Sequence, residues 1–459
     1  MKKTMQPRHG RPISRRDFLA QGFIGLSTTL FVPDLLFPKR AFGTDPLATL
    51  PYFIFDCAGG MSMPGNFLAG NQRGTEDLLA SYDVLGWNPR AAGALDRRFG
   101  LPMSALHSRL LQGLLQSTSA EAQARLRMGS FCHFSQDDSG INKTSAVSLI
   151  TRAGFRGRHI EAGLGGDATP SGGRTGTPIE EARLRPLHVT SINDIAQALS
   201  LGPAFLSMPT PALTNVGSAS LRLSELQSQS FSRRQGARAL RDSVTRAYEG
   251  SRAYVANAPE VDPRALEVFR SVYALTPETA PNDESAVSAA IVMNVLNQTA
   301  GPGVISIGGC DYHQSDETTP ERLSNGDAKD LEIGTQIGRA VEAAHRLRRP
   351  LFFQLLTDGG VTAAEGRRSW TGDAGDKSMT VIGYYSPTGA RETRRLQVGH
   401  YTNGQSANLD TLIGSDTSKV AYAVLANYLN LIGRIGDFER IAAGTGLTNQ
   451  NVDSLLVFA

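Results

Sequence analysis

The sequence predicts an α/β fold, with a central and mostly parallel sheet flanked by helices. Three short apolar runs, typical of buried strands, each lead within a few residues into an aspartate, and a helical pattern precedes each of the last two. Functional groups in such sheets gather beyond the carboxyl ends of the parallel strands, so we expect Asp56, Asp311 and Asp358 at one edge. The three runs cover residues 51–55, 304–307 and 351–356.

Two helical segments accompany the second and third runs. Residues 283–299 place Val287, Ile291 and Val295 at helical spacing, and residues 329–346 place four apolar side chains on one helical face. Strand and helix therefore alternate, which is the pattern of a parallel sheet whose strands are joined by helices.

The length and composition predict one large folded domain behind a leader. With 40% hydrophobic and 19% charged residues over 459 positions, the chain has enough apolar material for a sizeable core. We expect residues 44–459 to form the α/β domain, because the first and third apolar runs fit one sheet although about 300 residues separate them. Residues 180–280 would then be a helical insertion or cap, and the glycine-rich stretch 154–176 a long loop.

Residues 1–43 are predicted to be an export signal. Arg15 and Arg16 precede a modestly apolar stretch and then small residues, an order that resembles a twin-arginine translocation signal. The alternative is a membrane anchor, but the stretch is short and Asp34 would cross a bilayer poorly. We expect the twin-arginine translocation machinery as a partner and a periplasmic or extracellular mature protein. No second apolar run of about 18 residues follows, so we expect no stable membrane span in the mature form.

Charge and cysteine content exclude several classes of protein. The net charge is +3, but the first 43 residues hold eight Lys and Arg against two Asp, which leaves about −3 for the remainder. That body gives no electrostatic reason to expect nucleic-acid binding. Three cysteines exclude a disulfide framework and match no CxxC metal pattern. Cys57 stands beside Asp56 and Cys310 beside Asp311, so a bridge between these thiols is left open.

Carboxylates and histidines follow the predicted strand ends and indicate a metal site. Oxygen and imidazole nitrogen atoms are the ligands of zinc, manganese, magnesium and calcium in proteins, so we expect one of these divalent metals as cofactor. In chain order the candidate ligands are Asp56, Asp311, His313, Asp358 and His400.

The order of these parts resembles the alkaline phosphatase and sulfatase superfamily. A closer likeness is to an uncharacterised branch of twin-arginine-exported proteins, carried here by Gly59-Gly60-Met61-Ser62 and Cys310-Asp311-Tyr312-His313. The resemblance covers roughly residues 50–435, in short islands. It implies an alkaline-phosphatase-like fold.

The resemblance also implies a nucleophile and two metal sites. Thr144 stands ten residues before Gly154, which is the superfamily's spacing for its nucleophile. One metal site would consist of Asp311, His313 and His400. The second would be lined by Asp56, Asp358 and Thr144.

The chain departs from the superfamily at one ligand. Gly359 follows Asp358 where the superfamily has a histidine, and the loss of a ligand weakens metal binding. Nearby carboxylates could substitute for it, and the choice among them stays open. These are Asp316, Asp373 and Asp376.

Each candidate residue also has a structural interpretation. A strand-end aspartate often caps a turn or a helix, Thr144 could cap the helix that follows it, and either histidine could be an ordinary surface or core residue. His133 is a further candidate ligand or base. A Ser-His-Asp hydrolase is disfavoured, because the serine at position 62 lacks the Gly-x-Ser-x-Gly spacing.

Two functions compete at this point. The first is an exported, alkaline-phosphatase-like hydrolase that cleaves phosphate or sulfate esters of small molecules with a divalent metal. The alternative is a non-catalytic periplasmic binding or assembly protein that keeps a degraded hydrolase fold, and Gly359 favours it.

Overall fold

The computed structural model describes most of the chain beyond residue 49. Contacts group residues 45–198 with 260–459 as one compact unit, and residues 1–44 with 199–259 as another. All that follows concerns the first of these units. The predicted leader, much of the predicted loop and cap, and His313 lie outside the described residues. The described ranges are 50–57, 59–135, 142–160, 162–165, 186–199, 260–312, 320–364 and 370–459, with residue 215 and with backbone alone at 320–325 and 371–373.

A six-stranded sheet forms the centre of the described unit, in the order β12-β6-β11-β8-β1-β7. β1 pairs in parallel with both β7 and β8, and β11 is the one antiparallel strand of this sheet. The prediction of an α/β fold with a mostly parallel sheet is thus confirmed. The strands are β1 (Tyr52–Cys57), β6 (Leu126–Cys132), β7 (Gly303–Ile307), β8 (Leu351–Thr357), β11 (Met379–Tyr385) and β12 (Gln397–Val398).

The central strands are apolar on both faces because helices cover both sides of the sheet. Every residue of β1 and β8 is buried, which explains why each reads as a continuous apolar run. Gln354 is the exception within β8. Its side chain is fully buried, and it accepts a hydrogen bond of 2.6 Å from the Tyr52 hydroxyl.

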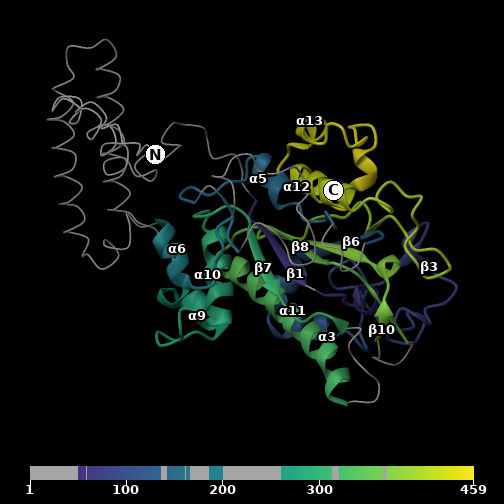
Figure 1. The fold of residues 1–459 in the computed structure, drawn as a ribbon, viewed down its shortest axis with the longest axis horizontal. Coiled ribbons are helices and arrows are strands. Elements are labelled where there is room, and N and C mark those ends of the chain that lie inside the picture. The colour runs from purple at the N-terminus through teal and green to yellow at the C-terminus, as the bar shows by residue number, and fades with distance from the viewer. Residues whose placement is uncertain are drawn as a thin grey trace, which may run out of the picture. The chain divides into compact units, whose positions relative to one another are not determined.

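One face of the sheet is covered by α10 (Glu284–Leu296) and α11 (Pro320–Arg346), with α3 (Arg109–Gln116) packed on α11 (Figure 1). The helix predicted over 283–299 is confirmed, and the Asp283 side chain caps it by accepting from the Ala286 amide at 3.1 Å. The α3 and α11 backbones touch, since a Cβ atom on Gly334 would lie 2.0 Å from the Leu110 carbonyl oxygen.

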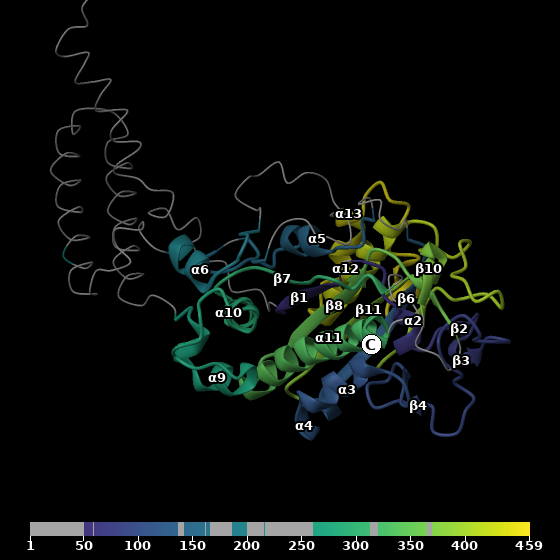
Figure 2. The same ribbon diagram turned by 60° about the horizontal axis from the view of Figure 1, so that its bottom comes forward.

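The other face is covered by α5 (Val147–Arg152) and α12 (Thr417–Leu431), and both views place α12 across the sheet from α11 (Figure 2). Here the packing is aromatic. The Tyr428 ring on α12 lies 6.4 Å from the Tyr52 ring, 6.1 Å from the Phe352 ring and 6.4 Å from the Phe155 ring, measured between centroids. Such ring contacts add to the free energy gained from burial.

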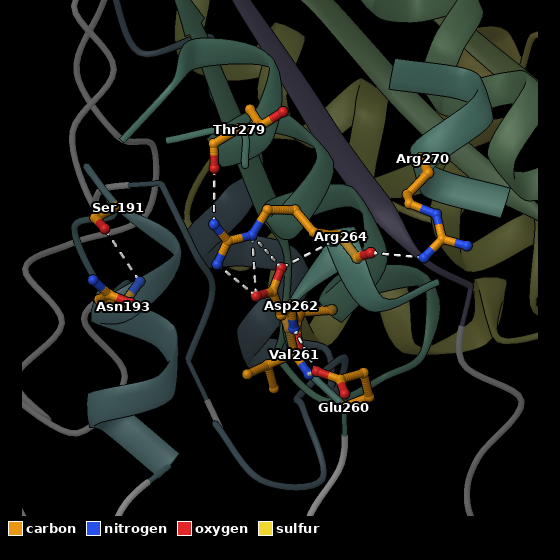
Figure 3. Close-up of polar contacts among 9 residues, drawn as sticks. Ser191, Asn193, Glu260, Val261, Asp262, Arg264, Arg270 and Thr279 are labelled. Carbon is orange, nitrogen blue, oxygen red and sulfur yellow. Dashed lines mark hydrogen bonds and ion pairs between the residues drawn. The ribbon is translucent and has the colours of Figure 1, made fainter. Parts of the chain in front are cut away.

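A polar clamp fixes the start of α9 (Glu267–Tyr273), just after the chain re-enters the described unit (Figure 3). Arg264 donates from Nε to the Asp262 carboxylate at 2.9 Å and from a terminal nitrogen at 2.7 Å. It also donates to the Thr279 carbonyl at 2.8 Å. Bidentate pairing of this kind holds a segment in one orientation, so we regard the clamp as structural.

Shorter elements complete the described part of the chain, in which no helix is long and apolar enough to cross a membrane. They are α2 (Met63–Asn66), β2 (Gly70–Asn71), β3 (Gly74–Leu78), β4 (Leu95–Asp96), β5 (Met103–Ser104), α4 (Ala120–Arg125), α6 (Ile192–Leu199), β9 (Val361–Ala363), β10 (Trp370–Asp373), α13 (Phe438–Ile441), and the 3-10 turns Pro263–Ala265, Gly375–Lys377, Ile435–Asp437 and Val452–Leu455.

Candidate functional site

Three aspartates lie along the carboxyl edge of β7, β1 and β8, where the sequence placed them. Asp56 is inside β1 rather than after it, and it is fully buried. Asp358 directly follows β8 and is 7% exposed. Asp311 follows β7 by four residues and packs on the turn after β1, because a Cβ atom on Gly59 would lie 2.7 Å from the Asp311 amide nitrogen. Only glycine fits this approach.

The segment that leads into α5 is tied to the end of β8. Asn142 donates from Nδ2 to the Asp358 carbonyl oxygen at 2.6 Å, and the Ser135 hydroxyl donates to the same oxygen. Four residues earlier in β8, Gln354 donates from Nε2 to the Thr144 carbonyl at 2.8 Å. These bonds position Thr144 beside the sheet.

Thr144 is buried, and its hydroxyl is unbonded within the part of the chain that the structure describes. Its exposed fraction is 1%, and Oγ1 has no hydrogen-bond partner among the described residues. The interpretation of Thr144 as a helix cap is wrong, because α5 is preceded by Ala146 at the cap position and no side chain caps it. The hydroxyl of Ser148, within α5, is also buried and unpartnered in the described part.

Thr144 and Asp56 belong to the same face of the sheet. Side chains two residues apart in a strand project from one face, so Tyr52 and Asp56 share a face. The Tyr52 hydroxyl bonds Gln354, and Gln354 in turn bonds the Thr144 backbone. Asp56 therefore lies on the face that the Thr144 segment covers.

His400 lies at the opposite side of the sheet from Asp311. It follows β12 by two residues, and its Nε2 atom is 2.9 Å from Asn408 Nδ2. Burial lowers the pKa of His400, with a smaller opposing effect from Asp77. Four strand spacings, about 19 Å, separate β12 from β1, on whose following turn Asp311 packs. The implied metal site that joins Asp311 to His400 does not fit this placement, because ligands must lie within about 2.6 Å of one cation.

No metal centre is formed by the described residues themselves. Among them, no group of three or more His, Cys, Asp and Glu side chains is arranged to hold an ion. Asp56, Asp358 and Asp311 share an edge without forming such a group.

His133 directly follows β6 and both its ring nitrogens are engaged. Nδ1 lies 2.9 Å from the Phe134 carbonyl and must donate to it, so Nε2, 3.0 Å from Thr380 Oγ1, accepts from that hydroxyl. Burial lowers the pKa of His133 to about 4. The imidazole is thus neutral and satisfied, as in a core histidine.

Of the carboxylates considered as substitute ligands, Asp376 is described and already paired. Its Oδ2 accepts from Lys377 at 2.9 Å and from Ser406 at 2.5 Å. Burial alone would raise the pKa of Asp376, but these two partners outweigh it and hold the pKa below its usual value. Asp316 and the side chain of Asp373 lie outside the described residues.

A second polar cluster, unforeseen from the sequence, lies under α11 on the other face. Asp330 accepts from the Tyr312 hydroxyl at 2.7 Å and from Asn66 Nδ2 at 3.0 Å. Ser108 donates to Asn66 Oδ1 at 2.6 Å. We call Asn66, Ser108, Tyr312 and Asp330 the α11 cluster. Burial raises the pKa of Asp330 to about 7.

Two signals in the sequence could have revealed the buried polar contacts of Gln354 and Asp330. Gln354 is a lone amide within an apolar run, and a buried amide needs hydrogen-bond partners. Asp330 lies on the buried side of a helix that was predicted from its apolar residues alone. A polar residue at a position that the helical spacing predicts to be buried is therefore the informative exception.

The chain matches no protein-family model, no curated protein and no solved structure. The resemblance to the alkaline phosphatase and sulfatase superfamily therefore remains a prediction from the sequence.

Proposed function

We propose that this chain is an exported hydrolase of phosphate or sulfate esters with an alkaline-phosphatase-like fold and Thr144 as its nucleophile. The observation that carries the proposal is the Thr144 hydroxyl, buried and unbonded within the described part of the chain, on the sheet face of Asp56. The Ser148 hydroxyl is likewise buried and unpartnered within the described part, so the position of Thr144 on the face of Asp56 is what distinguishes it.

The proposed reaction has two steps. Thr144 Oγ attacks the phosphorus or sulfur atom, the bond to the ester oxygen breaks, and the alcohol leaves with that electron pair. The threonine proton passes to the departing alkoxide. Water next attacks the ester formed on Thr144, which releases phosphate or sulfate and restores the hydroxyl.

The test compares two buried hydroxyls. The mature chain is assayed with 4-nitrophenyl phosphate and 4-nitrophenyl sulfate, alone and with added zinc, manganese, magnesium or calcium. We expect Thr144→Ala to lower kcat by about 10³-fold or more, since a covalent nucleophile has no substitute. Ser148→Ala removes a comparable hydroxyl and should retain activity. Full activity in Thr144→Ala would refute the assignment.

A non-catalytic binding or assembly protein is the second candidate. Gly359 after Asp358 and the position of His400 across the sheet favour it, because both remove ligands that the superfamily uses. Metal analysis of protein purified without chelators distinguishes the two. A divalent metal together with ester hydrolysis supports the enzyme, whereas absence of both supports the binding protein.

A further inference from the structure

Two buried cysteines lie at the carboxyl ends of β1 and β7, beside the site. Cys57 ends β1 and pairs in register with Ile307, the last residue of β7. Cys310 follows three residues later, and its thiol lies 3.3 Å from the Ile307 carbonyl oxygen. Both side chains are fully buried, and both are free thiols in this structure. The two thiols therefore have Ile307 as a common neighbour.

The Cys310 side chain also acts on the Cys57 thiol. Burial raises the pKa of Cys57 well above its usual value, and the neighbouring Cys310 raises it further. Because Cys57 alternates with Asp56 along β1, its thiol points to the other face of the sheet, toward the α11 cluster. The nearby Asp330 acts on the Cys57 thiol in the same direction.

We propose that Cys57 and Cys310 form a disulfide that fastens the end of β1 to the turn after β7. A small disulfide such as oxidised glutathione is the oxidant. Its sulfur–sulfur bond breaks as the Cys57–Cys310 bond forms, and the two cysteine protons pass to the two glutathione thiolates that are released. Asp56 and Asp311 adjoin the two bridged residues, so the bond fixes the spacing of two site carboxylates. Its formation in the cell rests on the proposed export to an oxidising compartment; its formation in vitro does not.

Cys132 provides a matched control. It is equally buried, but it ends β6, three strand spacings or about 14 Å from β1. A disulfide requires Cα atoms within about 7 Å, so Cys132 is out of reach of Cys57. Burial also raises the pKa of Cys132. If Cys57 forms a disulfide and Cys132 does not, the difference is therefore due to distance and not to burial.

Burial affects when the bond forms in vitro. Both thiols are fully buried, so a dissolved oxidant reaches them poorly in the folded, reduced protein. We therefore expect the bond to form in vitro as the reduced chain refolds.

The test is peptide mapping after oxidative refolding. The reduced, denatured full chain is refolded with a mixture of reduced and oxidised glutathione, alkylated, and digested without reductant. We expect a linked peptide that contains Cys57 and Cys310, with Cys132 alkylated. Alkylation of all three cysteines, or a linked peptide that contains Cys132, would overturn the proposal.

Stability measurements supply a second readout. Cys57→Ser, Cys310→Ser and the double variant should share one lowered Tm, about 5 °C or more below the oxidised wild type, because each removes the same bond. Cys132→Ser should not show this decrease in Tm. A reductant should lower the Tm of the wild type but not that of the double variant. If the serine variants fail to fold, the peptide map of the wild type still decides the question.

Discussion

Asp56 and Cys57 are neighbours in the sequence, but they face opposite sides of the sheet, and the two sides differ in how their polar groups are used. On the α5 and α12 side, aromatic rings fill the core and the hydroxyl of Thr144 is left unbonded within the described part. On the α11 side, helix backbones touch and the side chains of the α11 cluster bond one another. One face thus leaves a buried hydroxyl without a described partner, while the polar side chains of the other face are paired with one another.

The largest expected effect on stability is the loss of the aromatic packing on the α12 side. Tyr428→Ala removes a ring that contacts three others, and large-to-small changes of this kind cost about 3–5 kcal/mol in the free energy of unfolding. Chemical denaturation measures the loss. Tyr428→Phe keeps the ring and should cost about 1 kcal/mol. Equal losses in the two variants would show that the rings contribute little.

The next effect tests the backbone contact on the α11 side. Gly334→Ala places a methyl group 2.0 Å from the Leu110 carbonyl oxygen, so α3 and α11 must move apart. Overpacking of this kind costs about 1–3 kcal/mol, again measured by denaturation. Gly436→Ala is the control, since nothing lies within 4 Å of a Cβ atom there. An undiminished stability in Gly334→Ala would show that the two helices are not closely packed.

A further difference between the two faces is in how stability depends on pH. Burial raises the pKa of Asp330 to about 7, so between about pH 4 and 7 the folded protein holds a proton that the unfolded chain releases. The free energy of unfolding therefore falls as pH rises through this window, by at most about 1.4 kcal/mol per pH unit.

Asp330→Asn removes this titration. Its amide oxygen can still accept the bonds from Tyr312 and Asn66, so the variant should fold and show a flatter profile from pH 4 to 7. Denaturation midpoints across that range measure the slope. The same change at the exposed Asp410 should leave the profile as it is. A profile for Asp330→Asn that matches the wild type would contradict the prediction.

The sequence was informative where strands are buried on both faces. β1, β7 and β8 were predictable because continuous apolar runs are what such strands require. β6 and β11 were missed, since Gly129 and Gly383 interrupt their apolar patterns. The structure explains Gly383, where a Cβ atom would lie 2.2 Å from the Phe353 ring. That requirement comes from a partner strand 30 residues away, which no local pattern reveals.

The sequence likewise predicted one part of the candidate site and not another. The shared edge of Asp56, Asp311 and Asp358 follows from parallel strands, which the sequence indicates. The distance of His400 from that edge depends on the position of β12 in the strand order. Strand order is set by long-range pairing, so chain order alone suggested a grouping that the sheet does not make.

The central position of β1 has a consequence for synthesis of the protein. Its two partners, β7 and β8, are translated about 250 and 300 residues after it. At about 5–20 residues per second, roughly 15–60 s pass before β8 can pair with it. During that interval an apolar strand with unpaired backbone groups on both sides is exposed as the chain leaves the ribosome, and such segments are prone to aggregate. We therefore expect nascent β1 to depend on chaperones until nearly four fifths of the chain has been made.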